Sequence, residues 1–143
     1  MHATGNATWT GSWKHGHGTI STEGKTVQEV EYSYASRFDG AAGASPEELL
    51  CAAHAGCFNQ ALANNFGMID FEAAAIHTSI TVEFGTGEDG HPEIFDLKIV
   101  VEATVSGISE EQFQYCAERA RANCTISKII KCPIMMTATL LPG

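Results

Sequence analysis

One segment, residues 45–66, constrains the fold more than any other. It begins Ser-Pro-Glu-Glu, so a serine precedes a proline and a glutamate stands three residues after the serine. These are the N-cap, the first helical position and the returning carboxylate of a capping box. Gly67 follows the segment, and glycine in the left-handed conformation commonly ends helices. The sequence therefore predicts one long helix from Ser45 to about Phe66.

The predicted helix is apolar on nearly all its sides. From Leu49 to Phe58 only His54 is conventionally polar. A helix of this kind is buried on more than one side. A chain of 143 residues offers little beyond one sheet for that purpose, so we expect a second copy of the chain to cover the other side.

Two segments after this helix alternate between apolar and polar residues. Residues 76–84 read Ile-His-Thr-Ser-Ile-Thr-Val-Glu-Phe, and residues 95–105 place Phe95 and every second residue after it on the apolar side. This period of two is typical of half-buried strands. The residues between the segments are rich in Gly, Asp and Glu, so the sequence predicts a long antiparallel hairpin with one wet face.

Shorter elements complete the predicted fold. Residues 7–13 and 18–24 favour two strands joined by a polar turn, and residues 30–38 favour a third extended piece. A second capping box at Ser109 predicts a helix to about Asn123, with Phe113, Cys116 and Ala120 as its apolar stripe. A short helix is expected near residues 125–131 and a last strand over residues 134–141. This order indicates an α+β fold without βαβ alternation, in a single domain over residues 1–143.

Charge and composition exclude several classes of partner. The formal net charge is −9, from 8 basic and 17 acidic side chains. Nucleic acid and anionic lipid both require a basic face, so neither is an expected partner. No apolar run approaches the ~20 residues of a membrane span, and the first residues lack the apolar stretch of a signal peptide. We expect a cytoplasmic protein.

The five cysteines are widely spaced, odd in number and contain no Cys-x-x-Cys pair. This pattern argues against a disulfide framework, a zinc knuckle and a thioredoxin-type motif. Cys51 and Cys116 are interpreted as packing residues, as free cysteines commonly are.

Cys57 has three interpretations: a packing residue, a metal ligand or a nucleophile. His54 stands three residues before it and shares its helix face, but a third ligand is lacking, because His15 and His17 lie on a glycine-rich turn. We therefore expect no metal, and we interpret His54 as a hydrogen-bonded or interface histidine.

A nucleophilic Cys57 requires a lowered pKa, since only the thiolate attacks. It lies too far along its helix for the helix dipole to help, and burial would raise its pKa. A cation from another segment is therefore required. Arg37 is the best candidate, although its position alone favours an ordinary solvated arginine.

Two long stretches resemble a known family. Residues 36–62, SRFDGAAGASPEELLCAAHAGCFNQAL, and residues 107–131, GISEEQFQYCAERARANCTISKIIK, are similar to the two motifs of the osmotically inducible protein C / organic hydroperoxide resistance (OsmC/Ohr) family. The likeness runs nearly end to end, and the AHAGCF detail with His54 resembles the OsmC-like branch.

The resemblance implies a fold and an activity. The fold is the OsmC-like fold, with antiparallel sheets around a long central buried helix in an intertwined homodimer. The activity is that of a thiol-dependent peroxidase, an antioxidant enzyme of the oxidative stress response that reduces organic hydroperoxides and hydrogen peroxide. The resemblance implies a dithiol reductant of the lipoyl type, with no metal or other cofactor.

The resemblance also implies roles for four residues. Cys57 matches the peroxidatic cysteine and Cys124 the resolving cysteine, which form a redox-active disulfide. Arg37 matches the arginine that holds the thiolate, and Glu47 the carboxylate that orients that arginine. Helical phase supports Glu47, which lies about 80° around the helix from Cys57, over Glu48, which lies at about 180°. Glu48 is also committed to the capping box.

One residue departs from the family pattern. The family usually has proline after the resolving cysteine, whereas Thr125 follows Cys124 here. We expect a working but more mobile Cys124. Two other functions remain open at this point: a non-enzymatic redox sensor, and a dimeric module that binds an apolar ligand.

Overall fold

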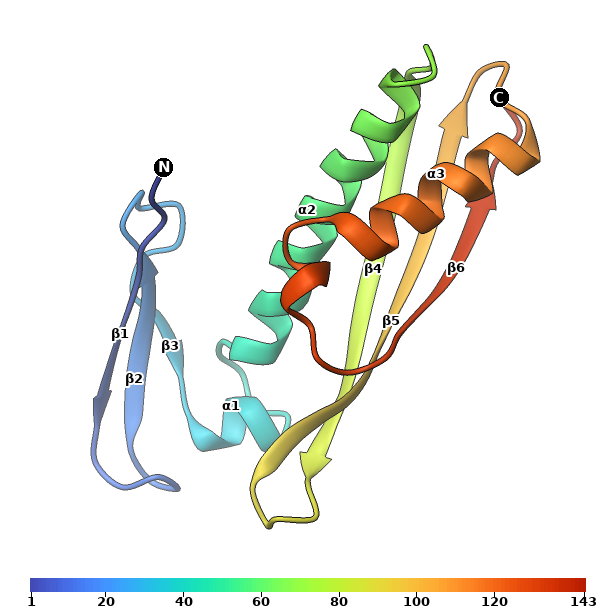
Figure 1. Cartoon of the computed structure of the whole chain (residues 1–143). Helices are drawn as coiled ribbons and strands as arrows, with labels where there is room; N and C mark the ends of the chain where they lie inside the picture. Colours follow the sequence, from blue (N-terminus) through green and yellow to red (C-terminus); the bar gives the residue numbers. More distant parts are fainter. The chain divides into compact units, whose positions relative to one another are not determined.

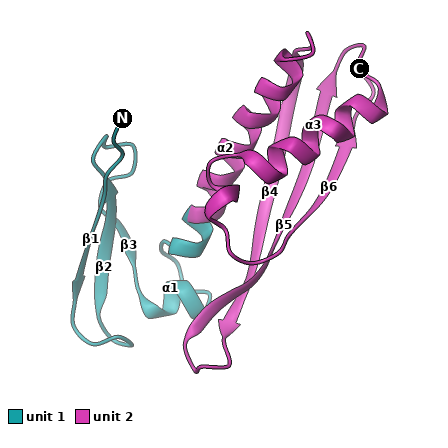
Figure 2. Cartoon of the chain, in the orientation of Figure 1, with its two compact units in different colours: residues 1–49 teal, residues 50–143 magenta.

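The computed structural model describes residues 1–143, which form two compact units. Figure 2 colours the first unit, residues 1–49, and the second unit, residues 50–143. No helix is both long and apolar enough to cross a membrane.

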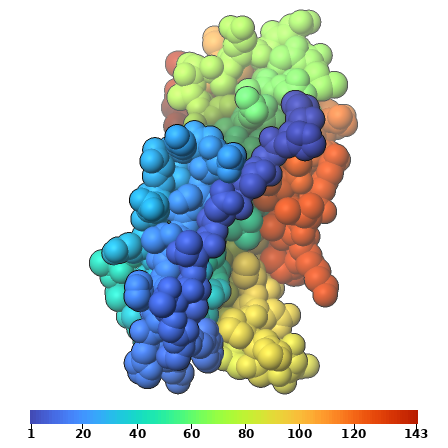
Figure 3. Space-filling view, turned by 90° about the vertical axis from the view of Figure 1, so that its left-hand side faces the viewer, coloured from blue at the N-terminus to red at the C-terminus, as the bar shows by residue number.

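The first unit contains a three-stranded antiparallel sheet. Its strands are β1 (Gly5–Thr10), β2 (His17–Thr22) and β3 (Val30–Tyr32), in the order β1-β2-β3. The two predicted strands and their connecting turn are thus confirmed. Every residue of β1 is exposed, and the space-filling view shows this dark blue strand uncovered on the face toward the viewer (Figure 3).

The third predicted extended piece is only partly extended. β3 ends at Tyr32, and residues Tyr34–Phe38 form the short helix α1. Ser33 caps this helix: its hydroxyl accepts from the N–H of Ser36 at 3.0 Å, and the Ser36 hydroxyl accepts from the N–H of Ser33 at 2.9 Å. A reciprocal pair of serines satisfies the free N–H groups of a helix start, and this local bonding outweighs the strand pattern.

The second unit is a three-stranded sheet with helices on one face (Figure 1). The strands are β4 (Ala73–Thr86), β5 (Pro92–Val105) and β6 (Ile134–Leu140), in the order β4-β5-β6. The long helix α2 (Pro46–Gly67) begins in the first unit and continues into the second. Helix α3 (Glu110–Asn123) precedes a short 3₁₀ turn, η1 (Ser127–Ile129).

The long hairpin is confirmed, but Phe95 does not face the core. β4 and β5 pair antiparallel, with a register shift at which Glu83 opposes Asp96 while Phe84 opposes Ile94. Phe95 is the extra residue of this bulge, and its side chain is 47% exposed. A bulge places an extra residue in one strand and interrupts the regular alternation of its side chains. Simple alternation along β5 therefore assigns Phe95 to the wrong face.

The prediction that the fold lacks βαβ alternation is wrong for the last third of the chain. β6 pairs parallel with β5, from Leu97 beside Ile134 to Ala103 beside Leu140. A parallel pair requires a crossover connection, and α3 lies within that connection. The fold remains α+β, with one β5-α3-β6 unit.

Helix α2 enters the core along one stripe. Its buried residues stand four apart, at His54, Phe58, Leu62 and Phe66. The ring of Phe66 stacks on Phe113 of α3, with centroids 6.0 Å apart and an interplanar angle of 21°. This contact joins the two helices above the sheet.

The C-terminus of α2 differs in detail from the prediction. Gly67 is the last helical residue, and it does not adopt the left-handed conformation expected of it. The left-handed residue is instead Asp70, with φ 65°. The chain therefore turns slightly later than the glycine predicts, through hydrogen bonds from the N–H groups of residues 69–71 back to Phe66 and Gly67.

Because Phe113 is fully buried against Phe66, Phe113→Ala should lower the free energy of unfolding by about 3–5 kcal/mol. Phe95→Ala is the matched control, since the same deletion at an exposed bulge should cost about 1 kcal/mol or less. Urea denaturation followed by circular dichroism measures both values. Equal losses for the two variants would contradict the assignment of the core.

Candidate active site

Cys57 lies on α2 opposite the turn that follows α3. The groups of this turn that act on its sulfur are the backbone N–H groups of Thr125 and Ile126, the Thr125 hydroxyl and the Cys124 thiol. Cys124 is the C-cap of α3, with φ −61° and ψ 148°, and its extended backbone directs the following residues toward α2. The structure thus brings together the two cysteines that the resemblance singled out.

These donors change the acidity of Cys57. Burial of the half-buried side chain acts to raise the pKa of the Cys57 thiol, but the hydrogen bonds from Ile126, Cys124 and Thr125 outweigh it and lower that pKa below its ordinary value. Hydrogen bonds to the charged form of a group favour ionisation. These neutral donors of the second unit therefore favour ionisation of Cys57.

Two other cysteines show the opposite behaviour. Burial raises the pKa of the Cys116 thiol, with Arg119 opposing the rise only partly. Burial also raises the pKa of Cys132, where a backbone hydrogen bond opposes it and the charge of Asp96 adds to it. Neither thiol is disposed to ionise, as expected for packing cysteines.

A buried polar chain lies behind Cys124. The Cys124 Sγ and Ser127 Oγ atoms are 3.0 Å apart, and the N–H of Ser127 donates to Cys124 Sγ at 3.4 Å. Ser127 Oγ in turn lies 2.7 Å from Nε2 of His54. His54 is fully buried, which lowers its pKa and keeps the imidazole neutral. The expectation of a hydrogen-bonded His54 is confirmed.

Arg37 and Glu47 form an ion pair in the first unit. The guanidinium donates to both carboxylate oxygens, through Nη2 to Oε1 and through Nε to Oε2 at 3.4 Å. The Ser45 hydroxyl also donates to Oε2, at 3.2 Å. Burial acts to raise the pKa of Glu47, but the hydrogen bonds from Arg37, from its own backbone and from Ser45 together lower it.

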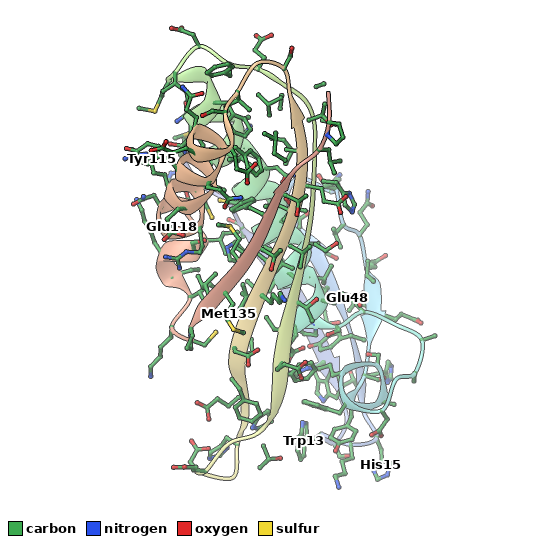
Figure 4. The ribbon with its side chains drawn as sticks, turned by 90° about the vertical axis from the view of Figure 1, so that its right-hand side faces the viewer. Trp13, His15, Glu48, Tyr115, Glu118 and Met135 are labelled. Carbon is green, nitrogen blue, oxygen red and sulfur yellow. The ribbon has the colours of Figure 1, made fainter.

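Glu48 contributes to the start of α2 through its backbone only, and the returning side-chain bond of the predicted capping box is not formed. The Ser45 hydroxyl accepts a hydrogen bond from its backbone N–H at 3.3 Å, and its side chain is exposed. Figure 4 labels Glu48 near the start of α2, along with Tyr115 and Glu118 on the outer side of α3. Glu47, and not Glu48, is therefore the carboxylate that pairs with Arg37.

An aromatic pocket adjoins Arg37 within the first unit. Its volume is about 300 Å³, and its other lining residues are Trp9, Trp13, Ser33, Tyr34 and Phe38. The Arg37 guanidinium lies 4.7 Å from the centroid of the Phe38 ring. The rings of Trp13 and Tyr34 meet edge to face, with centroids 5.0 Å apart. Such a pocket suits a molecule with an apolar body and a polar head.

The predicted site residues thus form two groups: Arg37 with Glu47, and Cys57 with Cys124. No group of three or more His, Cys, Asp or Glu side chains could hold a metal ion. Sequence reasoning missed the donors around Cys57 because it sought only a cation. The sequence did carry a signal at Thr125, which stands where the family usually has proline. Proline has no N–H, whereas threonine offers two donors, its backbone N–H and its hydroxyl.

Comparison with solved structures defines the fold class. The chain is similar to the organic hydroperoxide resistance protein OhrB of Bacillus subtilis, with a TM-score of 0.71, 23% identity, and coverage of 96% of this chain and 98% of that one. It is also similar to an OsmC-like protein of Mycoplasma pneumoniae, with a TM-score of 0.76, 14% identity, and coverage of 99% of both chains. The fold is therefore that of the OsmC and Ohr proteins.

The sequence comparisons give the family. Residues 38–139 match the family model described as OsmC-like protein. The chain is 35% identical over 136 residues to Peroxiredoxin OsmC of Escherichia coli (strain K12), covering 95% of this chain and 94% of the relative. This chain belongs to the OsmC-like protein family.

Thr125→Pro should raise the pKa of Cys57, because proline removes both the N–H and the hydroxyl that Thr125 directs at the sulfur. The extended backbone of Cys124 is the conformation that precedes proline, so the substitution should fold. Thr125→Val keeps the N–H and should give a smaller rise.

The ultraviolet absorbance of the thiolate, followed against pH, measures these shifts. A lowered pKa means that the thiolate persists to lower pH, so the transition should move upward from wild type to Thr125→Val to Thr125→Pro. Superimposable titrations of the three proteins would refute the role of Thr125.

Proposed function

We propose that this protein is a thiol-dependent peroxidase that reduces organic hydroperoxides and hydrogen peroxide, with Cys57 as its peroxidatic cysteine. The observation that carries the proposal is the environment of Cys57. The donors of the turn after α3 lower its pKa, and the Cys124 thiol is one of those donors. A low-pKa thiol beside a second thiol is the arrangement that peroxide reduction through a disulfide requires.

In the first step, the Cys57 thiolate attacks the distal oxygen of the hydroperoxide. The S–O bond forms as the O–O bond breaks, so the sulfur is oxidised to sulfenic acid and the peroxide is reduced to an alkoxide. The alkoxide takes a proton and leaves as the alcohol, or as water when the substrate is hydrogen peroxide. Preorganised donors stabilise the charge that develops on the leaving oxygen.

In the second step, the Cys124 sulfur attacks the sulfur of the sulfenic acid. The Cys57–Cys124 disulfide forms, and the hydroxyl group leaves as water with the proton of the Cys124 thiol. An external dithiol then restores both thiols by exchange, and is itself oxidised to a disulfide. The family resemblance favours a lipoyl-type dithiol.

Arg37 is proposed as the residue that holds the thiolate and steadies the leaving oxygen. The support is its place in the family motif and its clamp by Glu47, which fixes a guanidinium whose donors would otherwise be mobile. The aromatic pocket beside Arg37 supports a preference for hydroperoxides with an apolar organic group.

We further propose that the chain acts as one domain, residues 1–143, and assembles as a homodimer. Ala52, Ala53 and Gly56 on α2 are exposed although they lie in its most apolar segment. Small residues allow a second helix backbone to approach closely, and an apolar helix face left open favours association.

Cys57→Ser should abolish peroxide consumption with a dithiol reductant, because no other thiol has the same donors. Cys124→Ser should consume about one peroxide per chain and then stop, since the first step needs only the peroxidatic thiolate. Cys51→Ser and Cys116→Ser are the matched controls and should turn over as wild type. Steady turnover by Cys57→Ser, measured with cumene hydroperoxide and hydrogen peroxide, would refute the mechanism.

Sedimentation equilibrium at micromolar concentration should give a mass twice that of the chain, because the open face of α2 is covered in the dimer. Gly56→Glu places a bulky charge on that face, where nothing in the single chain lies within 4 Å of an added Cβ. This variant should sediment as a folded monomer. A monomeric wild-type protein would contradict the dimer.

A further inference from the structure

A buried chain of hydrogen bonds lies behind Cys124, and two of its members, His54 and Ser127, have no part in the reaction described so far. It joins three side chains of the second unit: His54 on α2, Ser127 at the start of η1, and Cys124 at the end of α3. These side chains are 0%, 6% and 2% exposed. Buried polar groups are costly unless they are hydrogen-bonded, so a chain of three in a small core calls for an explanation.

The direction of the chain follows from counting protons. Cys124 has one thiol proton, which in the structure is donated to Ser127 Oγ at 3.0 Å, and the Cys57 sulfur is its other neighbouring acceptor. When Cys57 is a thiolate, the charged sulfur is the stronger acceptor. The Cys124 proton then faces Cys57, and the Ser127 hydroxyl is left to donate to Cys124 Sγ.

His54 completes the chain as a neutral donor. Its Nδ1 atom is buried and has no hydrogen-bond partner. A buried N–H without a partner is rarer than a buried acceptor without one, so we assign the proton to Nε2. The Nε2–H group then donates to Ser127 Oγ across 2.7 Å, and the Ser127 hydroxyl is free to point at Cys124.

We propose that His54 and Ser127 are positioning residues for Cys124, which hold its sulfur against Cys57 and stabilise the negative charge that develops on it as its thiol loses the proton and attacks the sulfenic acid. The inference rests on the proposed function, since it concerns the second step of that reaction. Once the Cys124 proton has turned away, Ser127 offers two donors to the Cys124 sulfur: its N–H, which already donates at 3.4 Å, and its hydroxyl, whose oxygen lies 3.0 Å from the sulfur.

The balance of the step requires no protonation of His54. The Cys124 thiol loses its proton to the departing hydroxide of the Cys57 sulfenic acid, and water leaves. The S–O bond breaks as the S–S bond forms, so the Cys57 sulfur is reduced and the Cys124 sulfur is oxidised. Ser127 and His54 donate throughout and exchange no proton, which agrees with a histidine buried in its neutral form.

A single-turnover experiment separates the two steps. The full chain is reduced and mixed with one equivalent of cumene hydroperoxide. Sulfenic acid at Cys57 is trapped with dimedone, and the Cys57–Cys124 disulfide is followed by mass spectrometry of quenched samples. Ser127→Ala removes the hydroxyl alone, and Ser127→Thr restores it. His54→Leu removes the donor to Ser127, and His54→Gln retains one.

In Ser127→Ala the disulfide should form roughly ten- to a hundred-fold more slowly, the effect of losing one hydrogen bond to a developing charge. Sulfenic acid formation should stay close to the wild-type rate, so the intermediate accumulates. Ser127→Thr should recover most of the second rate, and His54→Gln should exceed His54→Leu. Thr78→Val is the matched control: it removes another polar contact with α2, at Asn59, and should change neither step.

The failures are distinguishable. If wild type forms no sulfenic acid, the proposed function fails and this inference fails with it. If Ser127→Ala forms sulfenic acid normally and the disulfide at the wild-type rate, the inference alone is wrong. Equal slowing of both steps would show that Ser127 only maintains the structure, which also overturns the inference. His54→Leu places an apolar side chain at a buried position. If that variant misfolds, the comparison of Ser127→Ala with Ser127→Thr decides the question.

Discussion

The hydrogen bonds from the turn after α3 to the Cys57 sulfur are the interaction on which the rest of the site depends. Cys57 lies in the middle of α2, where the helix dipole contributes little and burial opposes ionisation. The turn supplies what the helix lacks: two backbone N–H groups, a hydroxyl and a thiol. These donors are uncharged, so they favour the thiolate without adding a buried cation.

The fold holds this turn in place from both sides. The Cys124 N–H closes the last turn of α3 by donating to the Ala120 carbonyl at 3.0 Å, and the Cys124 carbonyl accepts from Lys128 at 3.2 Å. The stacked rings of Phe66 and Phe113 fix α3 against α2. Arg121, near the C-terminal end of α3, donates to the Ile134 carbonyl of β6 at 3.3 Å, which ties this end of the helix to the sheet.

Local signals in the sequence predicted much of this arrangement. Both capping serines, the long hairpin and the final strand depend on neighbouring residues or on simple alternation, so they were predictable. The choice of Glu47 over Glu48 also followed from a local rule, the phase of the two residues around the helix, and Arg37 pairs with Glu47. The exposed Phe95 and the β5-α3-β6 crossover depend on pairing between distant segments, which no single stretch of sequence encodes. The short helix at Tyr34 was missed although its cap, Ser33 with Ser36, is local.

The two cysteines of the site could be predicted from the sequence, but the hydrogen-bond donors around Cys57 could not. Cys57 and Cys124 are marked by family motifs, whereas backbone N–H groups leave no signature in a sequence. Thr125 was visible as a departure from the family, and it was interpreted as a source of mobility when its contribution is two donors. Ser127 had no signal at all, because its importance arises only where η1 meets His54.

The most direct test of this account is the ionisation of Cys57 in the reduced wild-type protein. The rate of its alkylation by iodoacetamide is measured against pH, with the Cys57 peptide followed by mass spectrometry so that the other four cysteines do not contribute. The account predicts a midpoint clearly below the ordinary cysteine pKa of about 8.5. A midpoint at or above that value would show that burial prevails over the hydrogen bonds, and the account would be wrong.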